Sequence, residues 1–323
     1  MFFSEKIYSF IKFNNLSCGA FLVMLVLILF GNPGKSYAQE SYSDDPRFIT
    51  QEDKELEKAK KFKVKTRTAV IYHHGSFAKI APEGVINEYL KYDSNGNKVE
   101  HTRFKGGKSV DTKWKYEYDD KGNIITLQGI DDTGRLQYQR VSTYNKNSSE
   151  IERREYKITS KEEYKIIYDY NEFGKLKRSD TYNSKGEKIW SEQLNYEGQN
   201  LTEQKSYNQA GENVSMMKFK CNKTGSVTEE IQVDPKTKKS TTINTYKYDK
   251  KGNLIEQISS NFKQMFEYNN RGDVVEDIMY NAFGGRQHKF KIEYDEKGLL
   301  IKRIRYNSND KQVYTVKYEY EYY

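Results

Sequence analysis

The chain has few of the residues that most often form cross-links, metal sites or catalytic centres. Its 323 residues include two cysteines, four histidines and four prolines. Only 36% of the residues are apolar and the mean hydropathy is −0.96, which is low for a domain with a thick aliphatic core. Because proline cannot donate to a strand ladder, its scarcity permits long runs of β-strand.

The histidines give no sign of a metal site. They are His73, His74, His101 and His288, and their spacing does not match that of zinc ligands. His73 and His74 are adjacent on an expected strand, so their side chains should face opposite sides of it. We interpret all four as structural or solvated residues.

The carboxylates give no catalytic signal either. Nearly all of them stand in expected turns or alternate with Lys, and turn formation explains the turn residues Asp93, Asp119, Asp249 and Asp295 without bound Ca²⁺. The sequence therefore predicts a non-enzymatic protein with no cofactor and no catalytic, cofactor-binding or metal-binding residue. It leaves the residues that bind a partner or ligand unassigned.

One long apolar run stands near the N-terminus. Lys6 and Lys12 precede the apolar residues 20–30, and Ser36-Tyr37-Ala38 follows as a small-residue cleavage site. This order is typical of a secretory signal peptide, and the run is too short for a spanning helix. We predict a signal peptide over 1–38 with cleavage after Ala38, and export to the periplasm, the cell surface or the medium. An uncleaved anchor is the alternative.

Signal removal leaves a single cysteine, Cys221, which excludes an intramolecular disulfide in the mature chain. The formal net charge is +8, with both signs interspersed along the sequence. No basic block is present, so the charge favours solubility over nucleic-acid binding.

Tyrosine is abundant, with 28 copies, and it marks a repeat. The motif Tyr-[Asp/Asn]-x-x-Gly occurs nine times: Tyr92–Gly96, Tyr118–Gly122, Tyr170–Gly174, Tyr182–Gly186, Tyr207–Gly211, Tyr248–Gly252, Tyr268–Gly272, Tyr280–Gly284 and Tyr294–Gly298. A unit of two strands recurs about every 26 residues, which indicates a repeat architecture.

Each position of the motif has a role in a β-hairpin. The Asp or Asn side chain can accept bonds from backbone N–H groups further along the turn. The Gly stands where a type I turn with a G1 bulge requires a left-handed conformation. Ser148, Thr237 and Asp310 replace this Gly in related turns, which should be strained or differently built.

The residues that flank the turns alternate with period two. Apolar or aromatic residues such as Tyr246 and Tyr248 alternate with charged ones such as Lys247. Cys221 stands in a tyrosine position, where we interpret it as a small packed hydrophobe rather than a reactive thiol. The predicted fold is all-β, a long antiparallel meander of tandem hairpins in a curved or coiled sheet of about twenty strands.

The chain is predicted to have three parts. After the signal peptide, residues 39–61 form a polar linker with one short helix that begins near Thr50. Residues 62–323 form the β-hairpin repeat domain.

The motif Tyr-x-Tyr-Asp-x-x-Gly-Asn, at 116–123 and 246–253, resembles the YD repeats of bacterial RHS-type proteins. The similarity covers about residues 85–323 and is strongest to short, exported, stand-alone YD-repeat proteins. Large RHS proteins build a β-sheet shell around a toxin, and no toxin domain or self-cleavage segment is recognisable here. The resemblance therefore implies an exported repeat protein and does not imply toxin delivery.

These patterns predict a scaffold that binds a protein or polymer at the cell envelope. The C-terminal residues Val313–Tyr323 should form an exposed edge strand that can accept a partner strand. Partners are an unknown protein or polysaccharide, without nucleic acid and without stable membrane insertion after signal removal. One alternative is a carbohydrate-binding module that uses exposed Tyr stripes. Another is an outer-membrane β-barrel, which the recurrence of Tyr at every turn disfavours.

Overall fold

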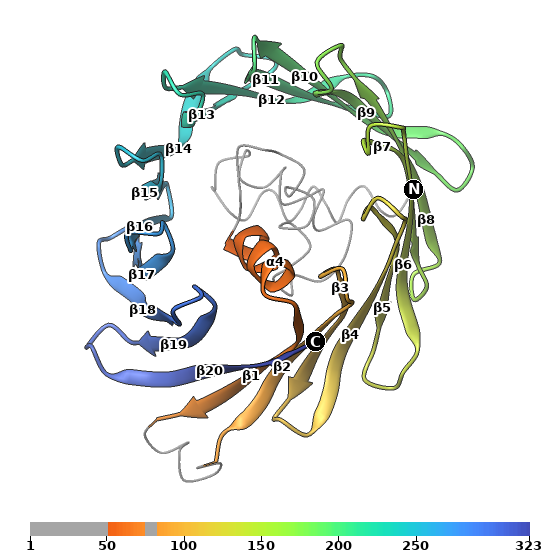
Figure 1. Cartoon of the computed structure of the whole chain (residues 1–323). Helices are drawn as coiled ribbons and strands as arrows, with labels where there is room; N and C mark the ends of the chain where they lie inside the picture. The colour runs from red at the N-terminus through yellow and green to blue at the C-terminus, as the bar shows by residue number, and fades with distance from the viewer. Residues whose placement is uncertain (1–50, 75–82) are drawn as a thin grey trace.

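The described chain is a closed sheet of twenty antiparallel strands around one helix (Figure 1). The structure is a computed structural model that describes residues 51–74 and 83–323. The predicted signal peptide lies outside the described residues. The predicted short helix is present as α4 (Gln51–Lys61).

Every strand pairs with the strand that follows it in the sequence. The strands are β1 (Val64–His73), β2 (Val85–Tyr92), β3 (Lys98–Lys105), β4 (Ser109–Tyr118), β5 (Ile124–Ile130), β6 (Leu136–Tyr144), β7 (Glu150–Lys157), β8 (Glu162–Tyr170), β9 (Leu176–Asn183), β10 (Lys188–Glu197), β11 (Asn200–Asn208), β12 (Asn213–Cys221), β13 (Val227–Val233), β14 (Ser240–Tyr248), β15 (Leu254–Ser259), β16 (Phe262–Tyr268), β17 (Val274–Asn281), β18 (Arg286–Tyr294), β19 (Leu300–Tyr306) and β20 (Gln312–Tyr322). The all-β meander that the sequence predicts is confirmed.

The two ends of the meander pair with each other. β20 pairs with β1 from Val64 opposite Tyr322 to His73 opposite Tyr314, and it also pairs with β19. The prediction of an exposed C-terminal edge strand is therefore wrong. A free edge presents unpaired N–H and C=O groups, and closure supplies partners for them on both ends of the meander.

The hairpin turns have the predicted geometry. In the turn after β2, the Gly96 N–H donates to the Asp93 carbonyl, and the Asp93 side chain accepts from the backbone of Asn95 and Asn97. The nine motif glycines all have positive φ, between 72° and 85°. The sequence pattern therefore encodes these turns one by one.

The turns that lack the glycine differ from the motif turns in strain or in length, as predicted. Ser148 and Asp310 take φ values of 62° and 58°, which L residues adopt only with strain. The turn after β13 is longer instead: Lys238, not Thr237, has the positive φ, and its N–H donates to the Asp234 carbonyl.

The two faces of the sheet differ in exposure. We call the face toward α4 the inner face and its opposite the outer face. Along β4, Tyr116 is buried on the inner face while its neighbours Lys115 and Glu117 are exposed on the outer face. The main apolar cluster joins Ala59 of α4 to inner-face residues that include Leu90. Among the described residues, no helix has the length and hydropathy to cross a membrane.

The two ends of the sheet also differ. The turns that follow even-numbered strands all lie at one end, which we call the helix rim because lysines of α4 bind there. The turns that follow odd-numbered strands form the opposite rim. The helix-rim turns comprise residues 93–97, 119–123, 145–149, 171–175, 198–199, 222–226, 249–253, 269–273 and 295–299.

Ser148→Gly should raise the free energy of unfolding by up to about 1 kcal/mol, because glycine holds a positive φ without steric cost. Gly174→Ala is the matched converse, since φ is 72° there and no atom lies within 4 Å of an added Cβ. It should lower stability by about 1 kcal/mol. Urea denaturation measures the free energy of unfolding of both variants. A change of the same sign in both would contradict the assigned cost of a positive φ.

Candidate functional site

A row of tyrosine hydroxyls binds the backbone along the helix rim. Tyr170, at the end of β8, donates to the carbonyl of Glu150 at 2.7 Å, where β7 begins. We call each such contact a tyrosine latch. Among the described residues, eight tyrosines near the end of one strand bond in this way to the start of the preceding strand, with O···O distances of 2.6–2.9 Å: Tyr118 to Lys98, Tyr144 to Ile124, Tyr170 to Glu150, Tyr196 to Leu176, Tyr248 to Val227, Tyr268 to Leu254, Tyr294 to Val274 and Tyr320 to Leu300. Tyr323 makes a related contact, to the carbonyl of Tyr92 at the end of β2, at 2.6 Å.

The latches explain why tyrosine rather than phenylalanine recurs before these turns. The acceptor carbonyl of Lys98 lies beyond the last residue pair of β3 with β4, so the Tyr118 hydroxyl takes the place of a ladder partner. Burial raises the pKa of Tyr268 to about 12, which keeps this donor protonated far above neutral pH. Cys221 holds the equivalent position in β12 and is half-buried there, as predicted from the repeat.

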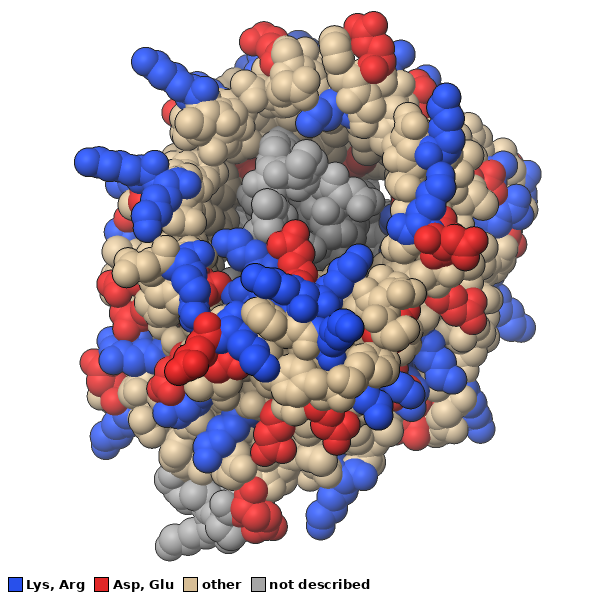
Figure 2. Space-filling model, in the orientation of Figure 1, with Lys and Arg blue, Asp and Glu red and all other residues tan. Residues whose placement is uncertain are grey.

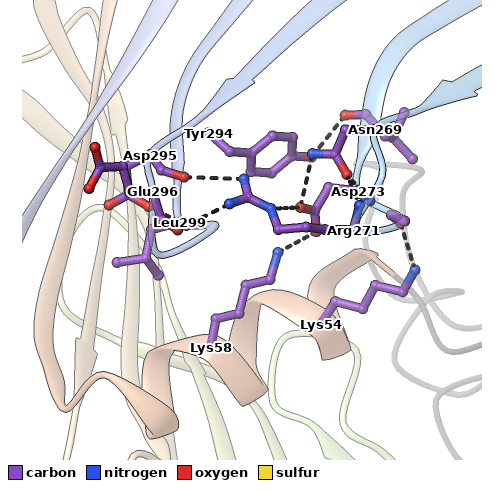
Figure 3. A network of polar contacts seen from close by, with 11 residues as sticks. Lys54, Lys58, Asn269, Arg271, Asp273, Tyr294, Asp295, Glu296 and Leu299 are labelled. Atoms are coloured by element: carbon purple, nitrogen blue, oxygen red, sulfur yellow. Dashed lines mark hydrogen bonds and ion pairs between the residues drawn. The ribbon is translucent and has the colours of Figure 1, made fainter.

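Helix α4 is fixed to the helix rim by charged contacts (Figure 3). Lys58 binds the Asp273 carboxylate at 2.5 Å, and the Lys54 ammonium donates to the carbonyl of Gly272 at 3.1 Å. Burial would raise the pKa of Asp273, but hydrogen bonds from Lys58 and Asn269 outweigh it and lower this pKa. The carboxylate is therefore charged at neutral pH and holds the helix by its lysine.

Arg271 joins this contact to the next turn of the rim. Its Nε donates to Asp273, and its two terminal nitrogens donate to the carbonyls of Asp295 and Glu296, each at 3.1 Å (Figure 3). One planar guanidinium thus bridges two neighbouring hairpin turns.

The other side of α4 contacts charged residues of the inner face. Arg67 of β1 binds Glu55 of the helix and Glu88 of β2, each at 2.6 Å. The second oxygen of Glu88 bonds to His101 at 2.8 Å. Burial alone would raise the pKa of Glu88, but the hydrogen bond from His101 and the charge of Arg67 lower it to about 2.

A pocket opens on the helix rim away from α4. It has a volume of about 540 Å³ and lies between the turns 222–226 and 249–253. Its residues combine apolar side chains with hydroxyl, amide, carboxylate and ammonium groups: Asn222, Thr224, Thr228, Tyr246, Lys247, Tyr248, Asp249, Lys250, Gly252 and Ile255. Small-molecule sites in proteins likewise combine apolar side chains with a few polar groups.

The gap between the turns 222–226 and 249–253 differs from two other gaps on the helix rim in the residue that precedes the turn glycine. Lys121 reaches from its turn to the carbonyl of Lys146 in the next turn at 2.9 Å, and Arg271 reaches Glu296 in the same way. Thr224 holds the corresponding position here, and its hydroxyl donates back to the Asn222 side chain at 2.7 Å. A threonine is too short to span the gap.

The four histidines lie apart from this pocket. The His73 ring packs edge-on to Tyr314, while His74 bonds to Thr315 at 2.9 Å, so the two lie on opposite faces as predicted. His288 packs against Phe290. Across residues 51–74 and 83–323, no group of three or more His, Cys, Asp or Glu side chains could hold a metal ion.

The turn aspartates serve the turns, as the sequence predicts. Both oxygens of Asp119 accept bonds from Asn123, and those of Asp249 do the same with Asn253. Sequence reasoning missed the pocket, and the residue before the turn glycine gave no signal for it, because Asn95 and Phe173 hold that position in other helix-rim turns.

The chain matches no protein-family model and no curated protein sequence. Several solved structures are distantly similar. A porin-like protein from Bacteroides uniformis ATCC 8492 shares 12% identity over 80% of this chain and 98% of its own, with a TM-score of 0.38. A porin-like protein from Bacteroides vulgatus ATCC 8482 shares 11% identity over 80% and 98%, with a TM-score of 0.24. A TcdB2-TccC3-Cdc42 structure shares 10% identity over 71% of this chain and 19% of its own, with a TM-score of 0.27.

These TM-scores are low, so the similarities carry no argument about function. The resemblance to YD repeats stays a prediction.

Tyr170→Phe should lower the free energy of unfolding by about 1 kcal/mol, because it removes the donor to the Glu150 carbonyl and keeps the ring. Tyr182→Phe is the matched control at a turn of the opposite rim, where no latch is formed, and should change stability by less than about 0.5 kcal/mol. Thermal unfolding compares the two variants. An equal loss in both would show that the hydroxyl bond is not the cause.

Acid should weaken the fold through Glu88. Its pKa of about 2 lies below the ordinary 4.5, so its stabilisation is complete above pH 4.5 and is lost as the pH falls toward 2. Glu88→Gln should cost up to about 3 kcal/mol at pH 7, and the difference from the unmodified protein should shrink across that pH range. Glu117→Gln on the outer face is the control. A pH-independent difference for Glu88→Gln would contradict the assignment.

Proposed function

We propose that the protein is an exported, non-enzymatic β-repeat scaffold that binds a protein or polymer at the cell envelope. The observation that carries the proposal is the pocket on the helix rim, where the regular repeat leaves a gap with mixed chemistry. Strand addition at a free edge is not available to this scaffold, because β1 and β20 pair with each other. Binding is therefore assigned to the helix rim and the inner face.

The outer face supports an aqueous location. Ion pairs connect neighbouring strands there: Glu256 of β15 binds Lys247 of β14 and Lys263 of β16, each at 2.7 Å. Lys220 binds Glu229 in the same way at 3.0 Å. Figure 2 shows residues of both signs spread over the outside of the ring. A lipid-facing surface would be apolar, so this charge pattern favours the proposed scaffold over an outer-membrane barrel.

The interspersed charges also argue against nucleic acid as the partner. Acidic side chains stand beside basic ones on adjacent strands, as in the pair of Lys302 and Glu293 at 3.0 Å. A phosphate backbone would meet both signs rather than a continuous basic surface.

A carbohydrate-binding module is the second candidate. The pocket favours it, because Tyr246 and Tyr248 line the pocket together with the amide of Asn222 and the carboxylate of Asp249. Under this proposal a sugar polymer is the envelope partner. The tyrosine stripes of the inner face serve mainly the fold, since many of their hydroxyls are engaged in latches.

Site-specific photo-crosslinking in native envelopes tests the proposed function. A photoreactive residue replaces Lys250 at the pocket, Lys185 on the opposite rim or Lys291 on the outer face, all of which are exposed. Position 250 should form adducts with a protein or polymer, and the other two should form few. The protein should also be recovered without detergent.

Equal adducts at all three positions, or none at position 250, would contradict the assigned surface. Recovery that requires detergent would contradict the aqueous scaffold.

A further inference from the structure

Two arginines stand next to each other on the inner face of β19. Arg303 and Arg305 are separated by one residue of the strand, so their side chains leave it on the same side. Arg303 lies opposite Val316 of β20, which lies opposite Ile71 of β1. Ile71 shares a face of β1 with Arg67, whose guanidinium binds α4, so this is the inner face.

The surroundings of the two arginines contain no counter-charge. Among the described residues, no carboxylate forms an ion pair with Arg303 or Arg305. Asp277, on β17, accepts a hydrogen bond from the Gln264 amide at 2.8 Å. The residues directly opposite the two arginines on the adjacent strands are apolar or aromatic, namely Ile292, Val316, Phe290 and Tyr314.

The other arginines on the described inner face each have an acidic neighbour. Arg67 and Arg153 bind carboxylates directly. Arg103 and Arg140 each have a glutamate directly opposite on an adjacent strand. The pair on β19 is therefore a local excess of positive charge.

Aromatic rings hold the two guanidinium groups in place. The guanidinium carbon of Arg303 lies 3.8 Å from the centroid of the Phe290 ring, and that of Arg305 lies 5.7 Å from the centroid of the Tyr314 ring. The centroids of these two rings are 6.5 Å apart. A guanidinium that stacks on a ring through its face can still donate from its edge, in its own plane.

The hydrogen-bond donors of both side chains are unused. Within the part of the chain that the structure describes, neither Arg303 nor Arg305 donates a side-chain hydrogen bond. The Nε of Arg303 is buried without a partner, whereas the terminal nitrogens of both groups are open to solvent. The planar fork of a guanidinium matches the paired oxygens of a carboxylate or a phosphate.

We propose that Arg303 and Arg305 form a binding site for an oxyanion, the carboxylate or phosphate group of a small ligand inside the ring. The rings of His73 and His288 pack edge-on against Tyr314 and Phe290 and border the site. A cationic ligand would be repelled by the two arginines, and a neutral one would leave their charges uncompensated. The site is separate from the helix-rim pocket, so the proposed scaffold function does not depend on it.

The test is calorimetric titration of the purified protein at constant ionic strength. Pyrophosphate and citrate are the two probes, and they distinguish a phosphate ligand from a carboxylate ligand. At least one of them should bind with a Kd of about 1 mM or tighter. Arg303→Gln and Arg305→Gln should each weaken this binding at least about tenfold, because each removes one charged fork.

Arg103→Gln is the matched control. It removes the same charge from a half-buried arginine of the same face, and the affinity should stay within about twofold of that of the unmodified protein. Arg305→Lys keeps the charge and removes the fork, so it should weaken binding at least about threefold. Circular dichroism and thermal unfolding verify that the variants fold, and Arg305→Lys decides the test if a glutamine variant does not.

Absence of binding by both probes at about 10 mM would overturn the site. An equal loss of affinity in Arg103→Gln and Arg305→Gln, or unchanged affinity in Arg305→Lys, would overturn it as well. Photo-crosslinking at position 250 reports on the helix rim, so the failure of the oxyanion site and the failure of the scaffold are told apart.

Discussion

The structure depends on one constraint: each strand must find hydrogen-bonding partners on both of its sides. Twenty strands in a meander would leave two free edges, and the pairing of β1 with β20 removes them. The tyrosine latches extend the same principle to the rim, where a carbonyl lies past the end of its ladder. A chain with few aliphatic residues can fold in this way because backbone bonds and tyrosine rings provide much of the order.

Much of this architecture could be predicted from local sequence. The Asp or Asn and the Gly of each motif encode a turn by themselves, and the identity of Cys221 as a substitute for tyrosine followed from its position in the repeat. The closure could not be predicted in this way. Nothing in the sequence around Val64 or Tyr322 indicates that these residues pair. From sequence alone the last strand therefore resembled a free edge.

The candidate site could also be predicted only in part from local sequence. The sequence predicted one short helix that begins near Thr50, and the helix is present as Gln51–Lys61. The place where the helix binds the sheet depends on Asp273, and the sequence of the turn that contains Asp273 resembles those of the other turns. The pocket depends on whether the residue at one turn position reaches the next turn, which requires the spacing between turns in three dimensions. The Lys121 ammonium reaches the next turn, whereas the short hydroxyl side chain of Thr224 bonds within its own turn, and only the structure shows this difference.

The antiparallel pairing of β1 with β20 restricts how such a chain can change its size. In a meander, successive strands reverse direction, so the first and last strands run antiparallel only when the strand number is even. Gain or loss of a single strand would make the closing pair parallel and bring the two chain ends to opposite rims. Duplication or deletion of a whole hairpin keeps the ring closed. The heritable unit of growth in this fold is therefore the two-strand repeat, and the ring can widen or narrow only in steps of two.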